Sequence, residues 1–382
     1  MCMHRSTKSP LAGEQRDNED MDTQLGRPSG ELFEPLFEPH RLLRNADVQT
    51  MLSRYRPRDL VCGPYDCPLL LDAGEDQTGW GEGRPVRMHG YYTPSLSLFG
   101  SRGLVLVLHG WEGSSHSVYN LVVTDTLIRA GYDVFRLNVR DHGPGLHLDP
   151  YALNRGFFMG TLLDEIVCAV SHIAEMSGEQ PFFIVGASMG GNLALRLAIR
   201  HASEPFPNLQ KVVAFNPALD PQHCAEALDA RPNYRRYFRS RWLRSLLKKQ
   251  ALFPELYDFT PLIHLPTLGQ MTDWVLEHYG DHFGRFASSA DYYRAYSVLG
   301  DAFHNLTTPT TIITAANDPV VPIKDFYALT PHPLLDIQIL RYGGHVGYID
   351  LFPLRHNLPR LLMEALRKEK KDRLDPTLAV VQ

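Results

Sequence analysis

The chain has 382 residues, of which 44% are hydrophobic and 21% are charged, and its formal net charge at pH 7 is −5. This composition is typical of a globular protein with a large apolar core, and the length suits one α/β domain that carries a sizeable insertion. The slightly acidic balance gives no reason to expect a nucleic-acid partner, so none is predicted.

The cysteines and the N-terminal residues indicate the compartment. The five cysteines are Cys2, Cys62, Cys67, Cys168 and Cys224. Cysteines that are few, odd in number and scattered are typical of free thiols in a reducing compartment. Their spacing does not match that of zinc ligands. We therefore predict neither a metal nor a cofactor. Residues 1–30 are polar and lack the apolar core of a signal peptide, and no apolar run approaches the ~20 residues that span a bilayer. A soluble cytoplasmic protein with a disordered N-terminal tail is expected.

From about residue 100, short apolar runs alternate with helical patterns. The runs predict strands over residues 104–108, 133–138, 181–185, 211–215, 310–315 and 336–341. The helical patterns cover residues 115–130, 161–176, 191–201 and 357–370. Such alternation predicts right-handed crossovers and a mostly parallel sheet with helices on both faces. Residues 59–73 and 84–92 flank a glycine-rich segment and are predicted to form antiparallel edge strands.

The alternation breaks between residues 221 and 306. This stretch is rich in aromatic and basic residues and has the pattern of several helices. An insertion between two strands, above their carboxyl ends, is well placed to cover an active site. We therefore predict a helical cap over residues 221–306, and an α/β core over residues 31–220 and 307–375.

A nucleophile motif follows the third of these strands. Residues 186–190 read Gly-Ala-Ser-Met-Gly and match the pattern G-x-S-x-G. The motif lies between an apolar run and a helical pattern, which is the strand–turn–helix context that it requires. The glycines let the chain pass close to a strained turn, and the helix N-terminus favours negative charge. Ser188 is therefore predicted to be the nucleophile of an α/β-hydrolase fold, the alternative being a tight turn in which the serine only caps a helix.

A serine hydroxyl needs a base, most often a histidine held by a carboxylate, and in this fold the chain order is serine, acid, histidine. His345 lies between glycines directly after the last predicted strand and is the predicted base, with an exposed loop histidine as the alternative. Asp318 follows strand 310–315 and precedes a proline that fixes the turn, so it is the predicted acid. The alternative acid is Asp220, after the preceding strand.

The oxyanion hole needs two N–H donors aimed at the developing charge. One is predicted to be the backbone N–H of Met189, directly after the nucleophile. The other is expected from the loop His109–Gly113 after the first parallel strand, through the backbone of Trp111. The Trp111 indole is expected either to form a wall of the pocket or to contact the cap. His109 is expected to be a structural hydrogen-bonding residue.

Several segments together resemble the YheT-type esterases of the α/β-hydrolase superfamily, which are related to the abhydrolase-domain lipases. The similar segments are Phe37–Pro39, Leu43–Asn45, Gln49–Thr50, His109–Gly113, Gly186–Gly191, Ala290–Tyr293 with Ser297, Asn317–Pro319 and Gly344–Gly347. The resemblance implies an α/β-hydrolase with Ser188, Asp318 and His345 as its triad. It also implies an ester substrate, either of short to medium acyl chain or lipid-like.

The predicted function is therefore that of a carboxylic ester hydrolase of the carboxylesterase or lipase type. An acyltransferase or a thioesterase would use the same acyl-enzyme, and a noncatalytic binding protein on the same fold is a third hypothesis. Dehalogenase or epoxide-hydrolase chemistry would require aspartate at position 188.

One segment of the predicted cap suggests a second kind of partner. Eight basic residues fall within it: Arg231, Arg235, Arg236, Arg239, Arg241, Arg244, Lys248 and Lys249. Aromatic and leucine residues are interleaved with them, and a helix with such faces is suited to weak peripheral contact with an anionic lipid surface. The alternative is a solvated basic face on a cap helix whose apolar side covers the active site.

Overall fold

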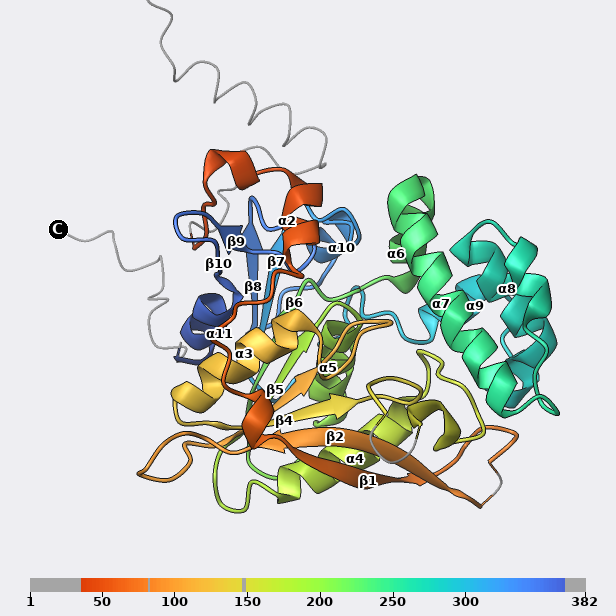
Figure 1. Cartoon of the computed structure of the whole chain (residues 1–382), viewed down its shortest axis with the longest axis horizontal. Coiled ribbons are helices and arrows are strands. Elements are labelled where there is room, and N and C mark those ends of the chain that lie inside the picture. Colours follow the sequence, from red (N-terminus) through yellow and green to blue (C-terminus); the bar gives the residue numbers. More distant parts are fainter. Residues whose placement is uncertain (1–35, 82, 146–148, 368–382) are drawn as a thin grey trace, which may run out of the picture.

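The computed structural model describes residues 36–81, 83–145 and 149–367, so the predicted tail lies outside it. Its centre is a sheet in the order β1-β2-β4-β3-β5-β6-β7-β8 (Figure 1). The strands are β1 (Cys67–Glu75), β2 (Pro85–Thr93), β3 (Leu104–Leu108), β4 (Asp133–Asn138), β5 (Phe182–Ala187), β6 (Leu209–Phe215), β7 (Thr310–Ala315) and β8 (Leu335–Leu340). β2 pairs antiparallel with both β1 and β4, and the other pairs are parallel. The predicted mostly parallel sheet is confirmed.

Helices cover both faces of the sheet because each central strand is apolar on both sides. Leu104, Leu106 and Leu108 of β3 join one core, whereas Val105 and Val107 join the other, as the two-residue period of a strand requires. The first core is shared with α4 (Leu163–Glu175) and α5 (Met189–Arg200), and the second with α3 (Val118–Arg129) and α11 (Leu358–Arg367).

The structure differs from the predicted elements near the N-terminus. β1 begins at Cys67 rather than at residue 59, because Gly63–Tyr65 form a short 3-10 helix that contains a proline. Helix α2 (Ala46–Leu52) was not predicted, although its N-cap residue Asn45 accepts a hydrogen bond from Val48 N–H at 3.0 Å. The short strands β9 (Ile349–Asp350) and β10 (Arg355–His356) and the short helix α10 (Lys324–Tyr327) were also not predicted.

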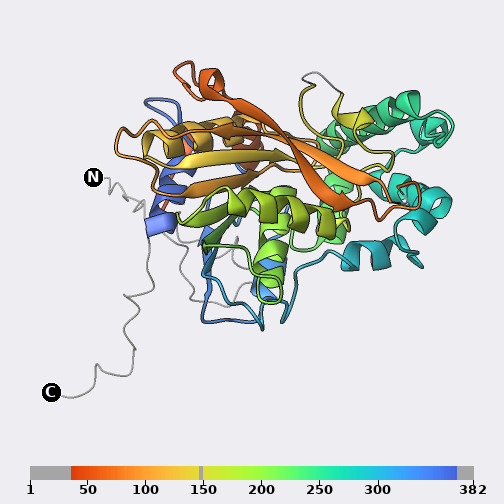
Figure 2. The same cartoon turned by 90° about the horizontal axis from the view of Figure 1, so that it is seen from below.

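Residues 221–306 form a helical insertion between β6 and β7. Its helices are α6 (Pro221–Ala230), α7 (Pro232–Leu252), α8 (Leu268–Tyr279) and α9 (Ser289–Arg294), with 3-10 turns at Thr260–His264 and Gly280–His282. They share an apolar core that includes Leu262, Met271 and Val275, together with Phe157 from the segment after β4. Figure 2 shows the insertion at one end of the sheet. Within the described ranges, no helix has the length and apolar character needed to cross a membrane.

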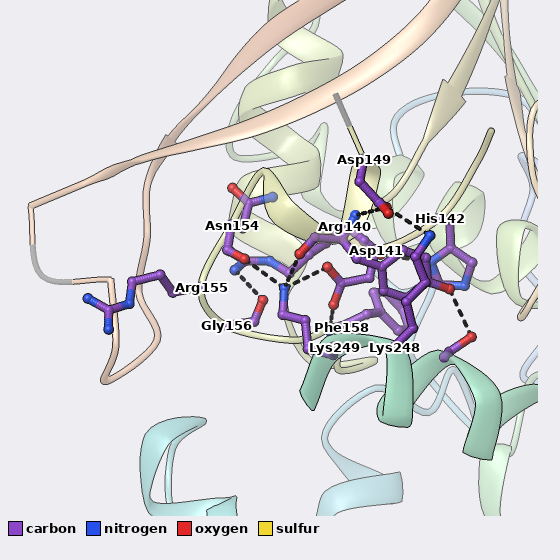
Figure 3. Close-up of polar contacts among 12 residues, drawn as sticks. Arg140, Asp141, His142, Asp149, Asn154, Arg155, Gly156, Phe158, Lys248 and Lys249 are labelled. Carbon is purple, nitrogen blue, oxygen red and sulfur yellow. Dashed lines mark hydrogen bonds and ion pairs between the residues drawn. The ribbon is translucent and has the colours of Figure 1, made fainter. Parts of the chain in front are cut away.

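Buried charges fix α7 of the insertion to the segment that follows β4. The Lys249 ammonium lies 2.8 Å from the Asp141 carboxylate and donates to the carbonyl oxygens of Tyr151 and Asn154 (Figure 3). Only 1% of the Lys249 side chain is exposed, and burial lowers the pKa of its amine. Lys248 adds a more exposed ion pair with Asp149 at 2.8 Å. Removing one partner of such a buried pair is strongly destabilising, so we expect α7 to have a defined position.

Candidate active site

Ser188 lies at the sharp turn between β5 and α5. Its backbone has φ 58° and ψ −120°, a strained conformation for a residue with a side chain, and its N–H donates to the Phe215 carbonyl. A Cβ on Gly186 would lie 2.0 Å from the Gly190 carbonyl oxygen, and one on Gly190 would lie 2.4 Å from that of Leu108. The turn therefore forms only with glycine at both positions of the motif.

The structure brings the predicted nucleophile, base and acid together. His345 Nε2 lies 2.9 Å from Ser188 Oγ, and His345 Nδ1 lies 2.9 Å from Asp318 Oδ2. A neutral imidazole can accept from the serine hydroxyl and donate to the carboxylate in this arrangement. The alternative acid, Asp220, lies elsewhere, because its side chain caps α6 by accepting from the N–H groups of Gln222 and His223.

The amide side chain of Asn216, which the sequence did not predict to be part of the site, holds the Asp318 carboxylate. Asn216, directly after β6, donates from Nδ2 to Asp318 Oδ2 at 2.7 Å, and its Oδ1 accepts from the Tyr348 hydroxyl. The other carboxylate oxygen accepts from the N–H groups of Val320 and Val321. None of the Asp318 side chain is exposed. The position of Asn216 at the carboxyl end of a parallel strand was the only sequence signal for this role.

The N-terminal helix α2 supports the loop that carries the base. Thr50 Oγ1 accepts a hydrogen bond of 2.9 Å from His345 N–H and donates to the Ala46 carbonyl. Buried Gln49 exchanges two hydrogen bonds with the backbone of Ile349. The Gln49–Thr50 pair was noted in the resemblance, but its role could not be predicted without the contact to His345.

The loop after β3 faces Ser188 and contains the predicted oxyanion donor. Gly110 N–H donates to the Tyr119 hydroxyl and Glu112 N–H donates to His142 Nε2, whereas Trp111 N–H donates to no described residue. Met189 is the first residue of α5, so its N–H has no acceptor within the helix. Both predicted N–H groups are thus available to a ligand.

His109 holds the start of this loop, as expected for a structural residue. Its Nε2 accepts from Val139 N–H at 3.2 Å and its Nδ1 contacts the Gly110 carbonyl at 2.8 Å. The side chain is fully buried, and burial lowers the pKa of His109 to about 3. The imidazole is therefore neutral at ordinary pH, which its two roles as donor and acceptor require.

Helix α7 contacts the same loop through several side chains. The Trp111 ring stacks on Phe238 at 5.8 Å and meets the Trp242 ring edge-on at 5.5 Å. Arg241 donates a hydrogen bond to the Glu112 carbonyl. The Trp111 indole therefore both contacts the insertion and forms a wall of the site.

Two cavities meet at Ser188. The small cavity has a volume of about 120 Å³ and no charged side chain among its described lining residues, which include Leu228, Val275 and Tyr292. The large cavity has a volume of about 700 Å³ and contains His345 and several charged side chains. Trp111 and Ser188 line both cavities, so a ligand that reaches the serine can extend into each of them.

Most basic residues of α7 bind groups of the protein itself. Backbone carbonyls accept from Arg235, Arg239 and Arg241, and carboxylates pair with Arg231, Lys248 and Lys249. Within the described part of the chain, Arg236 and Arg244 make no hydrogen bond or ion pair. The basic surface available to a lipid headgroup is therefore smaller than the sequence suggests. Among the residues that the structure covers, no group of His, Cys, Asp or Glu side chains is placed to hold a metal ion.

Comparison with known proteins places this site in a family context. Residues 100–335 match the family described as serine aminopeptidase, S33. The chain is 25% identical over 323 residues to the candidate esterase YheT of Escherichia coli, and the match covers 82% of this chain and 87% of that protein. It is 26% identical over 243 residues to the candidate esterase slr0264 of Synechocystis, a match that covers 57% of this chain and 62% of that protein.

Among solved structures, the chain is similar to the Pyrococcus furiosus esterase Pf2001, with a TM-score of 0.48 and 16% identity. The match covers 88% of this chain and 98% of that one. The family match and the relatives confirm the resemblance to YheT-type esterases. The family match and the mostly parallel sheet confirm the predicted α/β-hydrolase fold.

Proposed function

Since this chain belongs to the serine aminopeptidase S33 family of the α/β-hydrolase superfamily, and is a hydrolase, we propose that it is a serine esterase. In this proposal Ser188, His345 and Asp318 form a catalytic triad that cleaves carboxylic esters through an acyl-enzyme. The observation that supports it most is the continuous chain of hydrogen bonds from Ser188 Oγ through the imidazole to the buried carboxylate.

Each step follows from the geometry of these side chains. His345 Nε2 accepts the Ser188 proton as Oγ attacks the ester carbonyl, and Asp318 stabilises the imidazolium that forms. The N–H groups of Trp111 and Met189 receive the negative charge of the tetrahedral intermediate. His345 then protonates the leaving alcohol, and a water molecule activated by the same imidazole releases the acid.

In this proposal the two halves of the ester occupy different cavities. The alcohol oxygen must lie beside His345 to receive its proton, and His345 lines the large cavity but not the small one. The acyl group therefore occupies the small, apolar cavity. Its volume is about 120 Å³. Since a cavity of roughly 150 Å³ accommodates benzene, we expect acyl groups of about four to six carbons.

The test is a fluorophosphonate probe together with a butyrate ester. Wild-type protein should be labelled at Ser188 and should hydrolyse the ester. Ser188→Ala should not be labelled, and its kcat should fall by a factor approaching about 10⁶. The control Ser203→Ala changes an exposed serine after α5 and should leave labelling and turnover unchanged. Labelling of the Ser188→Ala variant would show that another serine is the nucleophile.

Contact with an anionic membrane surface is a separate part of the proposal and depends on Arg236 and Arg244. Co-sedimentation with anionic vesicles, weakened by salt and by replacing both arginines with glutamate, would support it. A protein that stays in the supernatant with every vesicle composition would leave the esterase proposal intact and remove the membrane contact.

A further inference from the structure

Two arginines in the large cavity have no carboxylate partner among the residues that the structure describes. Arg54 follows helix α2, and Arg241 lies on α7 of the insertion. The guanidinium carbon of Arg54 lies 4.3 Å from the ring centre of Tyr237, and that of Arg241 lies 6.0 Å from it. Two segments far apart in the sequence thus bring two cations to one aromatic ring.

The acidic side chains of the large cavity are engaged elsewhere. Asp47 lies 3.5 Å from Arg231 and accepts a hydrogen bond from the Tyr234 hydroxyl at 2.8 Å. Glu112 is buried and its carboxylate accepts from Ser245. Neither carboxylate forms an ion pair with Arg54 or Arg241 among the residues that the structure describes. The described lining of this cavity, which also contains the reacting serine and histidine, has three arginines against two carboxylates and is therefore positively charged. An oxyanion is the ligand that such guanidinium groups bind best.

We propose that Arg54 and Arg241 bind an anionic group, such as a phosphate, on the alcohol half of the ester substrate. This inference rests on the proposed function, because it is the proton transfer from His345 that places the alcohol in the large cavity. The substrate is then an ester with a short apolar acyl group and an alcohol that carries an oxyanion. Hydrolysis consumes one water molecule and releases the carboxylic acid and the anionic alcohol.

The test compares two monomeric esters that share the acyl group and the leaving oxygen, namely 1-butyrylglycerol and 1-butyrylglycerol 3-phosphate. A charge-assisted contact from partly exposed arginines should raise kcat/KM for the phosphate ester about tenfold, mainly through KM. Added salt should reduce that preference. In Arg54→Met the ratio of the two kcat/KM values should fall close to one, and Arg241→Met should lower it as well.

The matched control is Arg58→Met, which removes an exposed arginine four residues after Arg54 and outside the cavity, and should keep the wild-type ratio. A wild-type ratio at or below one, or an unchanged ratio in Arg54→Met, would overturn the proposal. A preference for phosphate that appears only with phospholipid in vesicles, and not with the monomeric esters, would also overturn it and assign the arginines to a lipid surface.

A binding measurement separates this inference from the proposed esterase function. Glycerol 3-phosphate should bind the Ser188→Ala variant in calorimetry, glycerol should not, and adding Arg54→Met should abolish the binding. Such binding without any ester cleavage by wild-type protein would contradict the esterase proposal alone. Cleavage of 1-butyrylglycerol without binding of glycerol 3-phosphate would contradict the anion site alone.

Discussion

Ser245 on α7 donates a hydrogen bond of 2.7 Å to the carboxylate of Glu112, the residue that follows Trp111 in the loop after β3. Arg241 from the same helix donates to the Glu112 carbonyl. The position of α7 and that of the proposed oxyanion donor are thus linked. We predict that Ser245→Ala lowers kcat about tenfold with little change in KM, less than the factor of about 10²–10³ that outright loss of a donor costs.

The control for this prediction is Ser240→Ala, since Ser240 is an exposed serine of the same helix whose hydroxyl donates to the Tyr237 carbonyl within α7. Glu112→Gly is a second informative variant. Glycine tolerates the backbone φ of 55° at this position, so the variant removes the carboxylate without introducing backbone strain. Equal kcat in Ser245→Ala and wild-type protein would show that the hydrogen bond from Ser245 does not position the loop.

Asp318→Asn should lower kcat by about 10⁴, because an amide cannot hold the tautomer of His345 that accepts the serine proton. Asp220→Asn should leave kcat near the wild-type value, since Asp220 caps α6 and contacts the imidazole of His223 rather than that of His345. Steady-state kinetics of both variants on a butyrate ester decides which aspartate is the acid. A large loss in Asp220→Asn together with a small one in Asp318→Asn would transfer the role of the acid to Asp220.

Leu228→Ala should change the preferred acyl length, because Leu228 is buried and lines the small cavity. Removing three carbons enlarges that cavity, so we expect the preferred acyl chain to lengthen by about two carbons, at a stability cost of about 2–5 kcal/mol. A series of esters from acetate to decanoate measures the shift. Leu262→Ala removes a buried leucine of the insertion that lies outside the cavity, so it should destabilise the protein without changing the preference.

The buried His109 predicts a pH dependence of stability. Burial lowers the pKa of His109 to about 3 in the folded protein, from 6.5 in the unfolded chain. Between these values the unfolded chain binds a proton that the folded protein does not, so stability is lost as the pH falls. We expect the free energy of unfolding to decrease from pH 7 to pH 4, and to decrease less in His109→Gln, whose amide can still donate and accept.

Urea denaturation at several pH values measures this difference. His304→Gln replaces an exposed histidine and should follow the wild-type pH dependence. If the free energy of unfolding changed equally with pH in wild-type protein and in His109→Gln, the assignment of a neutral imidazole to this site would be wrong.

Much of the sheet was predictable because its strands are short apolar runs that end at glycine or polar residues. β3, β4 and β7 begin and end where the sequence placed them. The candidate triad was predictable for a related reason, since residues that follow parallel strands meet at one edge of the sheet. Together with the G-x-S-x-G motif, chain order and strand-end position pointed to Ser188, Asp318 and His345, and the structure places these three side chains within hydrogen-bonding distance.

The contacts that support these residues could not be predicted. Asn216 and Asp318 are 102 residues apart in sequence, and no local pattern distinguishes that asparagine from the others. The partners of the basic residues of α7 could not be predicted either. The sequence suggested a free basic face, but Lys249 instead reaches a carboxylate 108 residues away in the buried segment after β4. Such long-range pairings depend on the packing of several elements at once.

The hydrogen bond between Thr50 and His345 joins residues that are 295 positions apart. On the ribosome, the turn around Ser188 is synthesised well before His345, and helix α2 emerges long before its partner loop. Domains generally fold as units as they emerge, so a nascent chain that ends before residue 345 contains the nucleophile without its base. The proposed esterase would therefore stay inactive throughout most of its own synthesis, and would gain activity only when the last part of the core has joined the first.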